Sequence, residues 1–495
     1  EEKSALSAVI DGEVKDGECL DVSITSRDEN FNGICVGGKG PYTVSGADVS
    51  LMGNGGNDFI GYGAGIMSGD DAVLTVEDSC ITTKGAARGA MFAGGHSKLY
   101  VKNCDISAED GVLPWDYEDN VMPGNMRRVP WMLGLRGNCR ATNLADYADA
   151  LYEDCTITSE AWGVMSTDGV RRCRLNLKNC DIAITGPSGY GAFSIGDCID
   201  TFEDCRIDVP DYALIMANET ASGVFKNTKV DAGRFAVMCF RNEGGKLVIT
   251  DGSVMNTDET TVVVKGCAPI IEADNCVLSP GNGIILQLMN SDDPGNPAGY
   301  YKDPTEDDTF DPTHDNKTAR ETYDVVATFK DMTVTGDFYN GSTGKKGDTG
   351  PKMEMAPPPG AGPEGPGGPG GPGGGPGGPG AKGNGYDGVR NMALTFDNAA
   401  VTGIISASKA LHRVEKVFKD NCEELGEVIN TAQPVVNNGV IVTLKNGATW
   451  TVAGTSYLSS LTIDDTSSVV GTLLVDGKET ALVPGIYTGA LTLTI

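Results

Sequence analysis

The chain has 495 residues, of which 68 are glycine, and its formal net charge is −30. This charge argues against nucleic acid or an anionic membrane surface as a partner, because both bind clustered Lys and Arg. The sequence has no run of about 18 apolar residues, so we expect no membrane insertion.

The first residues, Glu1, Glu2 and Lys3, are polar and show no signal peptide. They fit either a cytoplasmic protein or a mature secreted protein whose signal has been removed. We expect a secreted or cell-surface location, because long glycine-rich β repeats occur mostly there. An excess of carboxylates would also keep such an exposed protein soluble.

One unit recurs along the chain, as in VKNCDISAED, LKNCDIAITG and FEDCRIDVP. Each copy has Asn or an acidic residue before Cys, and then a short run in which polar and apolar residues alternate. Copies lie 23–25 residues apart. A period in the low twenties is typical of a parallel β-helix or a leucine-rich repeat. Because the leucine pattern is missing, we predict an all-β fold, a right-handed parallel β-helix whose coils stack about 4.8 Å apart.

The cysteine of this unit marks one position in each coil. We expect the same position to hold Cys80, Cys104, Cys155, Cys180, Cys205 and Cys276, and elsewhere Thr228, Ser253, Met332 and Ala399. A position that accepts all these side chains does not require a disulfide, so we expect mainly free, buried thiols. The chain has no CxxC pair, and we therefore expect no zinc site.

The predicted organisation has four parts. Residues 1–60 form an N-terminal cap and the first coils, and residues 61–340 form the β-helix, with loop insertions at 110–130 and 290–322. Residues 341–390 are a Pro/Gly-rich insertion with glycine at every third position from Gly362 to Gly383. This tract fits either a collagen-like bundle, which would make an oligomer, or a low-complexity insertion. Residues 391–495 supply the last coils and a β-rich C-terminal cap.

Several stretches carry a family resemblance: FNGICVGG, ARGAMFAGG, EAWGVMSTDG and GVIVTLKNGATWTVAGTSYLSSLTID. With them the chain resembles a family of secreted right-handed parallel β-helix repeat proteins of anaerobic Gram-positive bacteria, which share the pectate-lyase-like superfold. The resemblance covers nearly the whole chain except the Pro/Gly-rich insertion. It implies the fold and an extracellular location, but no activity, because the wider class contains pectate lyases, polygalacturonases and adhesins.

Candidate site residues come from aligning the apolar runs that end the repeats. The alignment places in one inward row Met67, Leu133, Met165, Phe193, Ile215, Met238, Val263 and Ile285. Three residues further on it predicts a polar strip with Asp70, Arg136, Asp168, Asn218 and Arg241, and with Asp197 alongside. Acids set among bases suit general acid–base catalysis. The same mixture would equally form a polar ladder that neutralises itself.

Asp168 is the candidate catalytic carboxylate, with Asp116 or Asp197 as its partner. Substrate binding is assigned to Arg136, Arg140, Arg241, Asn218, Trp131, Trp162 and Trp115. Exposed tryptophans would stack on sugar rings, but the two coil tryptophans, Trp131 and Trp162, could instead pack beneath the 110–130 insertion.

Two functions remain open. The first is an extracellular β-helix protein that either binds glycans or acts on them as a glycoside hydrolase or polysaccharide lyase. The second is a non-catalytic surface adhesin or structural protein. We expect no cofactor, with Ca²⁺ as the one alternative, for which the candidates are the acidic residues Asp116, Glu118 and Asp119 and the segment Asp303–Asp315. Neither group has the spacing of an EF-hand.

Overall fold

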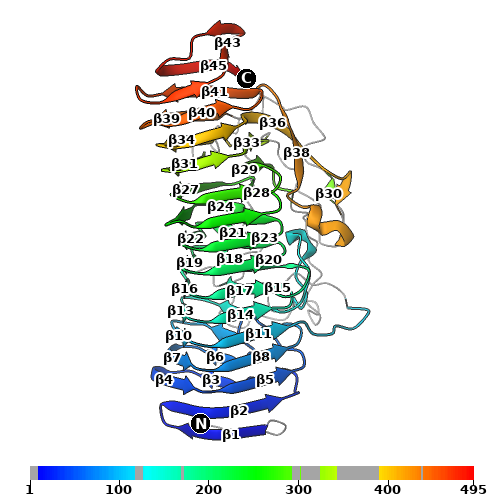
Figure 1. Cartoon of the computed structure of the whole chain (residues 1–495). Coiled ribbons are helices and arrows are strands. Elements are labelled where there is room, and N and C mark those ends of the chain that lie inside the picture. The colour runs from blue at the N-terminus through cyan, green and yellow to red at the C-terminus, as the bar shows by residue number, and fades with distance from the viewer. Residues whose placement is uncertain are drawn as a thin grey trace, which may run out of the picture.

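The computed structural model describes residues 9–117, 126–168, 172–292, 301–302, 324–342, 390–417, 419–435 and 439–495. Short strands stack along one axis, from β1 at the N-terminal end to β45 at the C-terminal end (Figure 1). Across these ranges helix is limited to two 3-10 turns, η1 (Trp131–Leu133) and η2 (Lys419–Glu424). Neither turn could cross a membrane. The predicted all-β parallel β-helix is confirmed.

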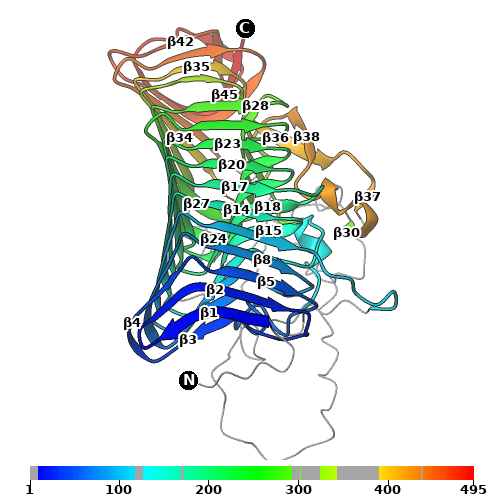
Figure 2. The same ribbon diagram turned by 60° about the horizontal axis from the view of Figure 1, so that its bottom comes forward.

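Each coil contributes up to three strands, and each strand pairs in parallel with its equivalents in the neighbouring coils (Figure 2). Face 1 consists of β4 (Lys39–Ser45), β7 (Asp71–Glu77), β10 (Lys98–Lys102), β13 (Asp149–Glu153), β16 (Arg174–Lys178), β19 (Ile199–Glu203), β22 (Ser222–Lys226), the second half of β24 (Phe235–Thr250), β27 (Ala268–Asp274), β31 (Val325–Lys330), β34 (Met392–Asp397), β39 (Val440–Lys445) and β41 (Ser456–Ile463).

Face 2 follows face 1 in every coil. It consists of β5 (Asp48–Met52), β8 (Cys80–Lys84), β11 (Asp105–Glu109), β14 (Thr156–Ser159), β17 (Asp181–Ile184), β20 (Arg206–Val209), β23 (Lys229–Ala232), β25 (Val254–Thr257), β28 (Val277–Pro280), β32 (Thr333–Thr335), β35 (Ala400–Gly403), β40 (Thr449–Val452) and β42 (Ser468–Val470).

Face 3 precedes face 1. It consists of β3 (Ile34–Val36), β6 (Ile66–Ser68), β9 (Met91–Ala93), β12 (Thr142–Leu144), β15 (Trp162–Thr167), β18 (Gly189–Ile195), β21 (Tyr212–Glu219), the first half of β24, β26 (Val262–Lys265), β29 (Ile284–Met289), β33 (Asp337–Asn340) and β36 (Ile405–His412).

Antiparallel strands close both ends of the solenoid. At the N-terminal end β1 (Val9–Lys15) pairs with β2 (Glu18–Ser26). At the C-terminal end β43 (Thr472–Val475), β44 (Lys478–Thr480) and β45 (Gly485–Thr494) form an antiparallel sheet that continues from β41. These strands pair the backbone groups that the last coil would otherwise leave open. Beside the coils, β30 (Tyr301–Lys302) pairs with β37 (Lys416–Val417), and β36 pairs with β38 (Val428–Ala432).

The corner between face 1 and face 2 is a left-handed turn that Asp and Asn tolerate better than other L-residues. Asp154, Asn179 and Asp204 occupy this corner in three successive coils, with φ of 57°, 51° and 56°. The amide of Asn179 donates to the Asp154 carboxylate at 2.7 Å, and Asn227 donates to Asp204 at 2.6 Å. Alternation of acid and amide therefore replaces repulsion between stacked carboxylates with hydrogen bonds.

The residue after this corner points into the core and is small in most coils, although Met332 occupies the same position. Cys104, Cys155 and Cys180 occupy this position, and the backbone carbonyl of each accepts a hydrogen bond from the next coil. The prediction that Cys80 belongs to this row is wrong: Ser79 occupies the position, and Cys80 is exposed on β8. The error is one residue of register, since Asp105 pairs with Cys80. No disulfide joins any of the 14 cysteines, and 12 of them are buried, in agreement with the prediction of mainly free, buried thiols.

Charged residues just before the corner also alternate in sign along the solenoid. Lys102, Glu153, Lys178 and Glu203 are neighbours in register on face 1. If a coil stacked on the next coil but one, like charges would lie opposite each other. The alternation therefore favours the observed pairing of consecutive coils.

A test of the corner ladder is the substitution Asn179→Asp. It places three carboxylates in succession, from Asp154 to Asp204, and removes the 2.7 Å hydrogen bond. We expect the free energy of unfolding to fall by about 1 kcal/mol, because like charges directly opposite each other are destabilising. Thermal denaturation measures the change, and about 1 M NaCl should remove most of it.

The control is Thr402→Asp, which adds the same charge in a row of threonines, Thr335 and Thr451 being its neighbours. Equal destabilisation by both substitutions would show that the alternation of acid and amide has no special role.

Candidate functional site

Face 3 differs from the other two faces because it is buried on both sides. All six residues of β15 and all four residues of β26 are buried, whereas exposed and buried residues alternate on β10 and β13. A second hydrophobic cluster covers the outside of face 3, formed by Val129, Leu135, Trp162, Tyr190, Phe193, Tyr212, Ile215, Ala217, Phe235, Met238, Val263 and Met289. Face 3 therefore offers no open sheet surface along these strands.

A segment from late in the chain contributes to this cover. We call residues 413–417 and 419–427 the strap; they lie alongside the middle coils, next to η1 (Figure 1). The Arg136 guanidinium contacts the Glu423 carboxylate at 2.9 Å, and Arg413 contacts Glu259 at 2.8 Å. The strap thereby joins parts of the chain that are up to 287 residues apart.

Beneath the strap lies a seat of buried charges. Arg234 donates to Glu427 at 3.2 Å and to the Tyr212 hydroxyl at 2.7 Å. Nearby, Lys265 and Asp292 form an ion pair at 2.7 Å with both side chains fully buried. Burial raises the pKa of Glu427 from its ordinary 4.5 to about 7, although Arg234 and Arg413 act in the opposite direction. These groups hold the strap and have no surface that a ligand could reach.

The two tryptophans are buried, as in the alternative left open by the sequence, but Trp131 packs beneath the strap and not beneath the 110–130 insertion. Trp131 is 3% exposed and packs with Cys422 and Leu425 of the strap. Trp162 is 2% exposed and stacks on Arg140, whose guanidinium carbon lies 4.8 Å from the ring centroid. The prediction that these two rings stack on sugars is therefore wrong for this structure.

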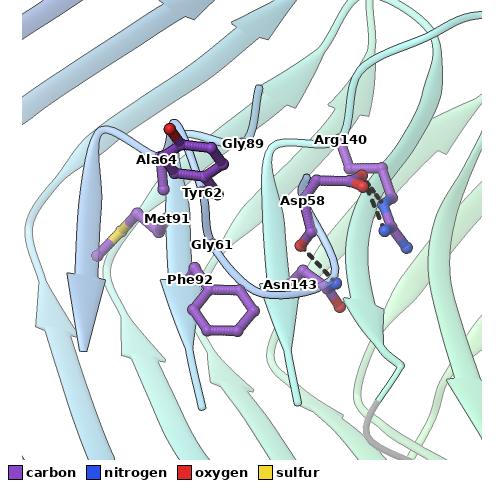
Figure 3. Close-up of a pocket in the computed structure, with 9 residues that line it drawn as sticks. All are labelled: Asp58, Gly61, Tyr62, Ala64, Gly89, Met91, Phe92, Arg140 and Asn143. Carbon is purple, nitrogen blue, oxygen red and sulfur yellow. Dashed lines mark hydrogen bonds and ion pairs between the residues drawn. The ribbon is translucent and has the colours of Figure 1, made fainter. Parts of the chain in front are cut away.

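Arg140, which lies just before β12, is the centre of a buried ion cluster, and Figure 3 shows it with Asp58 and Asn143. Its Nε donates to Asp58 Oδ2 at 2.8 Å, and its Nη1 contacts the carboxylate of Asp168. The side chains of Arg140, Asp58 and Asp168 are 2%, 2% and 6% exposed. Asn143 completes the cluster by donating to the Asp58 carbonyl at 3.0 Å.

Attraction between the Arg140 guanidinium and the carboxylates of Asp58 and Asp168 holds this cluster together. Burial lowers the pKa of Arg140, but the carboxylates of Asp168 and Asp58 outweigh burial and raise it. Burial raises the pKa of Asp58, and Arg140 opposes that shift. A cavity of about 10 Å³ beside Asp58, Arg140 and Asn143 has room for about one water molecule. Asp168 is thus paired with Arg140 and not with Arg136, and its side chain is only 6% exposed.

The predicted polar strip is only partly correct. Asp70, Asn218 and Arg241 do share a left-handed corner after face 3, with φ of 54°, 60° and 51°. Asp168 is not at this corner, because Thr167 pairs with Ser194 and thereby aligns Asp168 with Ile195. Arg136 lies outside the rungs, since the true rung of its coil is β12 and Leu133 belongs to η1. The alignment failed at Arg136, where the 110–130 insertion interrupts the repeat, and at Asp168, where it was one residue out of register between β15 and β18.

The remaining predicted site residues are dispersed. Trp115 is 97% exposed and Asp116 is exposed beside it on the 110–117 segment. Asp197 accepts a hydrogen bond from the backbone of Arg172 at 2.5 Å, and Arg241 is exposed.

The Ca²⁺ candidates are mostly not placed. Glu118, Asp119 and the segment Asp303–Asp315 lie outside the described residues, as does most of the 341–390 insertion. In the part of the chain that the structure describes, no three His, Cys, Asp or Glu residues are grouped to hold a metal ion.

An open hollow lies on face 1, where the sequence analysis placed no site. Its volume is about 500 Å³, and it spans β10, β13, β16 and β19. The lining residues are Lys98, Tyr100, Asp149, Ala150, Leu151, Arg174, Asn176, Leu177, Lys178, Thr201 and Glu203. Tyr100 is 41% exposed. In the sequence, the outward tyrosine between two lysines in Lys98–Lys102 indicates this hollow. The alignment of apolar runs considered only the strands of face 3 and therefore missed it.

Fold and site together define a parallel β-helix protein with an occluded face 3 and an open polar hollow on face 1. No protein-family model matches the chain, and the comparisons with curated proteins and with solved structures gave no match. Membership of the secreted β-helix family accordingly stays a prediction.

The Arg140 cluster can be tested with a pair of arginine variants. We expect Arg140→Gln to lower the free energy of unfolding by about 3–5 kcal/mol, because it leaves two buried carboxylates without a cation. Arg136→Gln, which removes a half-exposed ion pair, should cost less than about 1 kcal/mol. Chemical denaturation of the two variants gives the comparison, and similar losses in both would contradict this description of the cluster.

The seat of the strap predicts a pH dependence. The pKa of Glu427 is raised in the folded state, so its contribution to stability is complete below about pH 4.5 and is lost as the pH rises through about 7. The loss amounts to about 3 kcal/mol at most. Across this range the melting temperature of the Glu427→Gln variant should fall less than that of the wild type. Parallel curves for the two proteins would mean that Glu427 does not titrate in the seat.

Proposed function

We propose that this chain is a non-catalytic extracellular protein that binds glycans in the hollow on face 1. The observation that carries the proposal is an exposed tyrosine in an open hollow lined by hydrogen-bonding side chains. An aromatic ring can cover the apolar face of a sugar, while side chains beside it bond the hydroxyl groups. Face 1 supplies Tyr100 as the ring, and Asn176, Thr201 and Asp149 as the bonding groups.

Stacked coils also match the shape of a linear glycan. Equivalent residues on neighbouring coils are about 4.8 Å apart along the axis, which is close to the length of one pyranose ring. Tyr100, Leu151, Asn176 and Thr201 form one such outward row across four strands. A short oligosaccharide lying along this row would meet one coil with each sugar.

The non-catalytic half of the proposal is supported by the state of the candidate carboxylates. Asp168 is 6% exposed and paired with Arg140. Asp197 is held beside Arg172. Neither residue lines the hollow. The predicted pair of catalytic carboxylates is therefore not assembled in one open cleft, as hydrolysis would require, although two other acids, Asp149 and Glu203, line the hollow.

An extracellular location remains part of the proposal. It is supported by the sequence resemblance and by the net charge of −30. The alternative is that the chain acts on glycans as a hydrolase or lyase, and the experiment below would detect the products.

The central test is Tyr100→Ala. We expect it to weaken glycan binding about tenfold or more, because an exposed aromatic surface is lost, and to leave stability within about 0.5 kcal/mol. The matched control is Trp115→Ala, which removes a more exposed ring away from the hollow and should leave affinity unchanged. Binding of the full chain to an immobilised panel of plant, bacterial and host glycans provides the measurement.

Three results would refute the proposal. If Tyr100→Ala and Trp115→Ala weaken glycan binding equally, the hollow is not the binding site. If the protein binds no glycan of the panel, the proposed function is refuted. New reducing ends or unsaturated products during incubation would identify an enzyme, and loss of those products in Asp168→Asn would restore Asp168 as its catalytic carboxylate.

A further inference from the structure

The charges around the hollow form bands, one coil wide. Strand β10 presents Lys98 and Lys102 on either side of Tyr100. The next strand, β13, presents Asp149 and Glu153 on either side of Leu151. The order of sign is therefore positive and then negative, because the two strands pair residue for residue.

The positive band then repeats. Strand β16 presents Arg174 and Lys178 on either side of Asn176, again in register with β13. Two positive bands are thus separated by two coil spacings, about 9.6 Å. One negative band lies between them.

Ion pairs that stabilise the pairing of the coils explain only one of the two rows of alternating charge on face 1. The row from Lys102 to Glu203 has ion pairs of 4.0 and 3.9 Å that alternate as the fold requires. The row of Lys98, Asp149 and Arg174 repeats the same signs on the other side of Tyr100. Within the described ranges neither Lys98 nor Arg174 forms an ion pair with a carboxylate. Lys98 is exposed and Arg174 is partly exposed, so a ligand can reach both cations.

Arg174 is also held in position. Its Nη1 donates to the backbone carbonyls of Cys173 at 3.1 Å and Asp197 at 3.4 Å. An anchored guanidinium loses little side-chain freedom when it binds a carboxylate. Three lysine and arginine residues line the hollow against two acids, in a chain whose net charge is −30.

We infer that the hollow selects a linear polysaccharide in which acidic and uncharged sugars alternate, such as a uronic acid alternating with an N-acylated amino sugar. Carboxylates two sugars apart would lie on the two positive bands. Hydroxyl and amide N–H groups of the sugar between them would donate to Asp149, which lines the hollow between the two bands. The inference rests on the proposed function, because it names the ligand class of the same hollow.

Three probes test the inference by calorimetry with the full chain at low ionic strength. The first is a hexasaccharide of alternating glucuronate and N-acetylglucosamine, and the second is the same chain with its carboxyl groups reduced. The third is hexagalacturonate, which carries a carboxylate on every sugar. We expect the first probe to bind at least about tenfold more tightly than either of the others, since each paired carboxylate adds a charge-assisted hydrogen bond.

Variants locate the effect. Lys98→Gln combined with Arg174→Gln should reduce affinity for the first probe to that of the reduced chain. Lys246→Gln is the control, because Lys246 lies on face 1 outside the hollow and is paired with Glu272 at 2.8 Å. Asp149→Asn removes the acid between the two positive bands, so it should reduce the difference in affinity between the first probe and hexagalacturonate.

The outcomes separate this inference from the proposed function. If the reduced chain binds as tightly as the acidic one, selection by charge is refuted while glycan binding stands. If hexagalacturonate binds as tightly as the alternating chain, alternation is refuted. If a wider panel of glycans also gives no binding, both the inference and the proposed function fail.

Discussion

Stacking in exact register is the constraint on which the rest of this structure depends. In a parallel β-helix every side chain lies directly above its equivalent in the coil below, at about 4.8 Å. A favourable neighbour is then repeated along the molecule, and so is an unfavourable one. The acid and amide ladder at Asp154, Asn179 and Asp204 and the alternating charges from Lys102 to Glu203 are responses to this constraint.

The same constraint separates structural from accessible polar groups. On face 3 the outer side is covered, so any charge there must find a partner within the protein. Arg140 with Asp58 and Asp168, and Arg234 with Glu427, satisfy that requirement. On face 1 the outer side is open, and its polar side chains can serve a ligand. A residue type that indicates chemistry on one face therefore indicates packing on another.

Much of the fold could be predicted because the repeat is visible in the chain. Coil length, the small-residue position and the free thiols all follow from the spacing of residues such as Cys155 and Cys180. Register was predicted less well: Cys80 was one residue out, and Met165 pairs with Ala192 instead of Phe193. Periodicity gives an average spacing, whereas register depends on individual loops and turns.

The candidate site could not be predicted in the same way. Whether Asp168 is open or buried depends on Arg140 and on Asp58, a loop residue from an earlier coil 82 positions before that arginine. The burial of Trp131 depends on the strap, almost 300 residues later, and no local pattern reveals that contact. The hollow depends on four strands acting together, with Tyr100 contributing one ring.

The strap also has a mechanical consequence. In a simple solenoid each coil contacts only its neighbours, so tension applied at the two ends passes through every coil in series. The strap contacts the middle coils directly through the pairs Arg136–Glu423 and Arg234–Glu427. Tension can therefore pass from the strap to those coils without passing through every coil in the series. Peeling of the coils from either end would therefore also have to break the contacts between the strap and the middle coils.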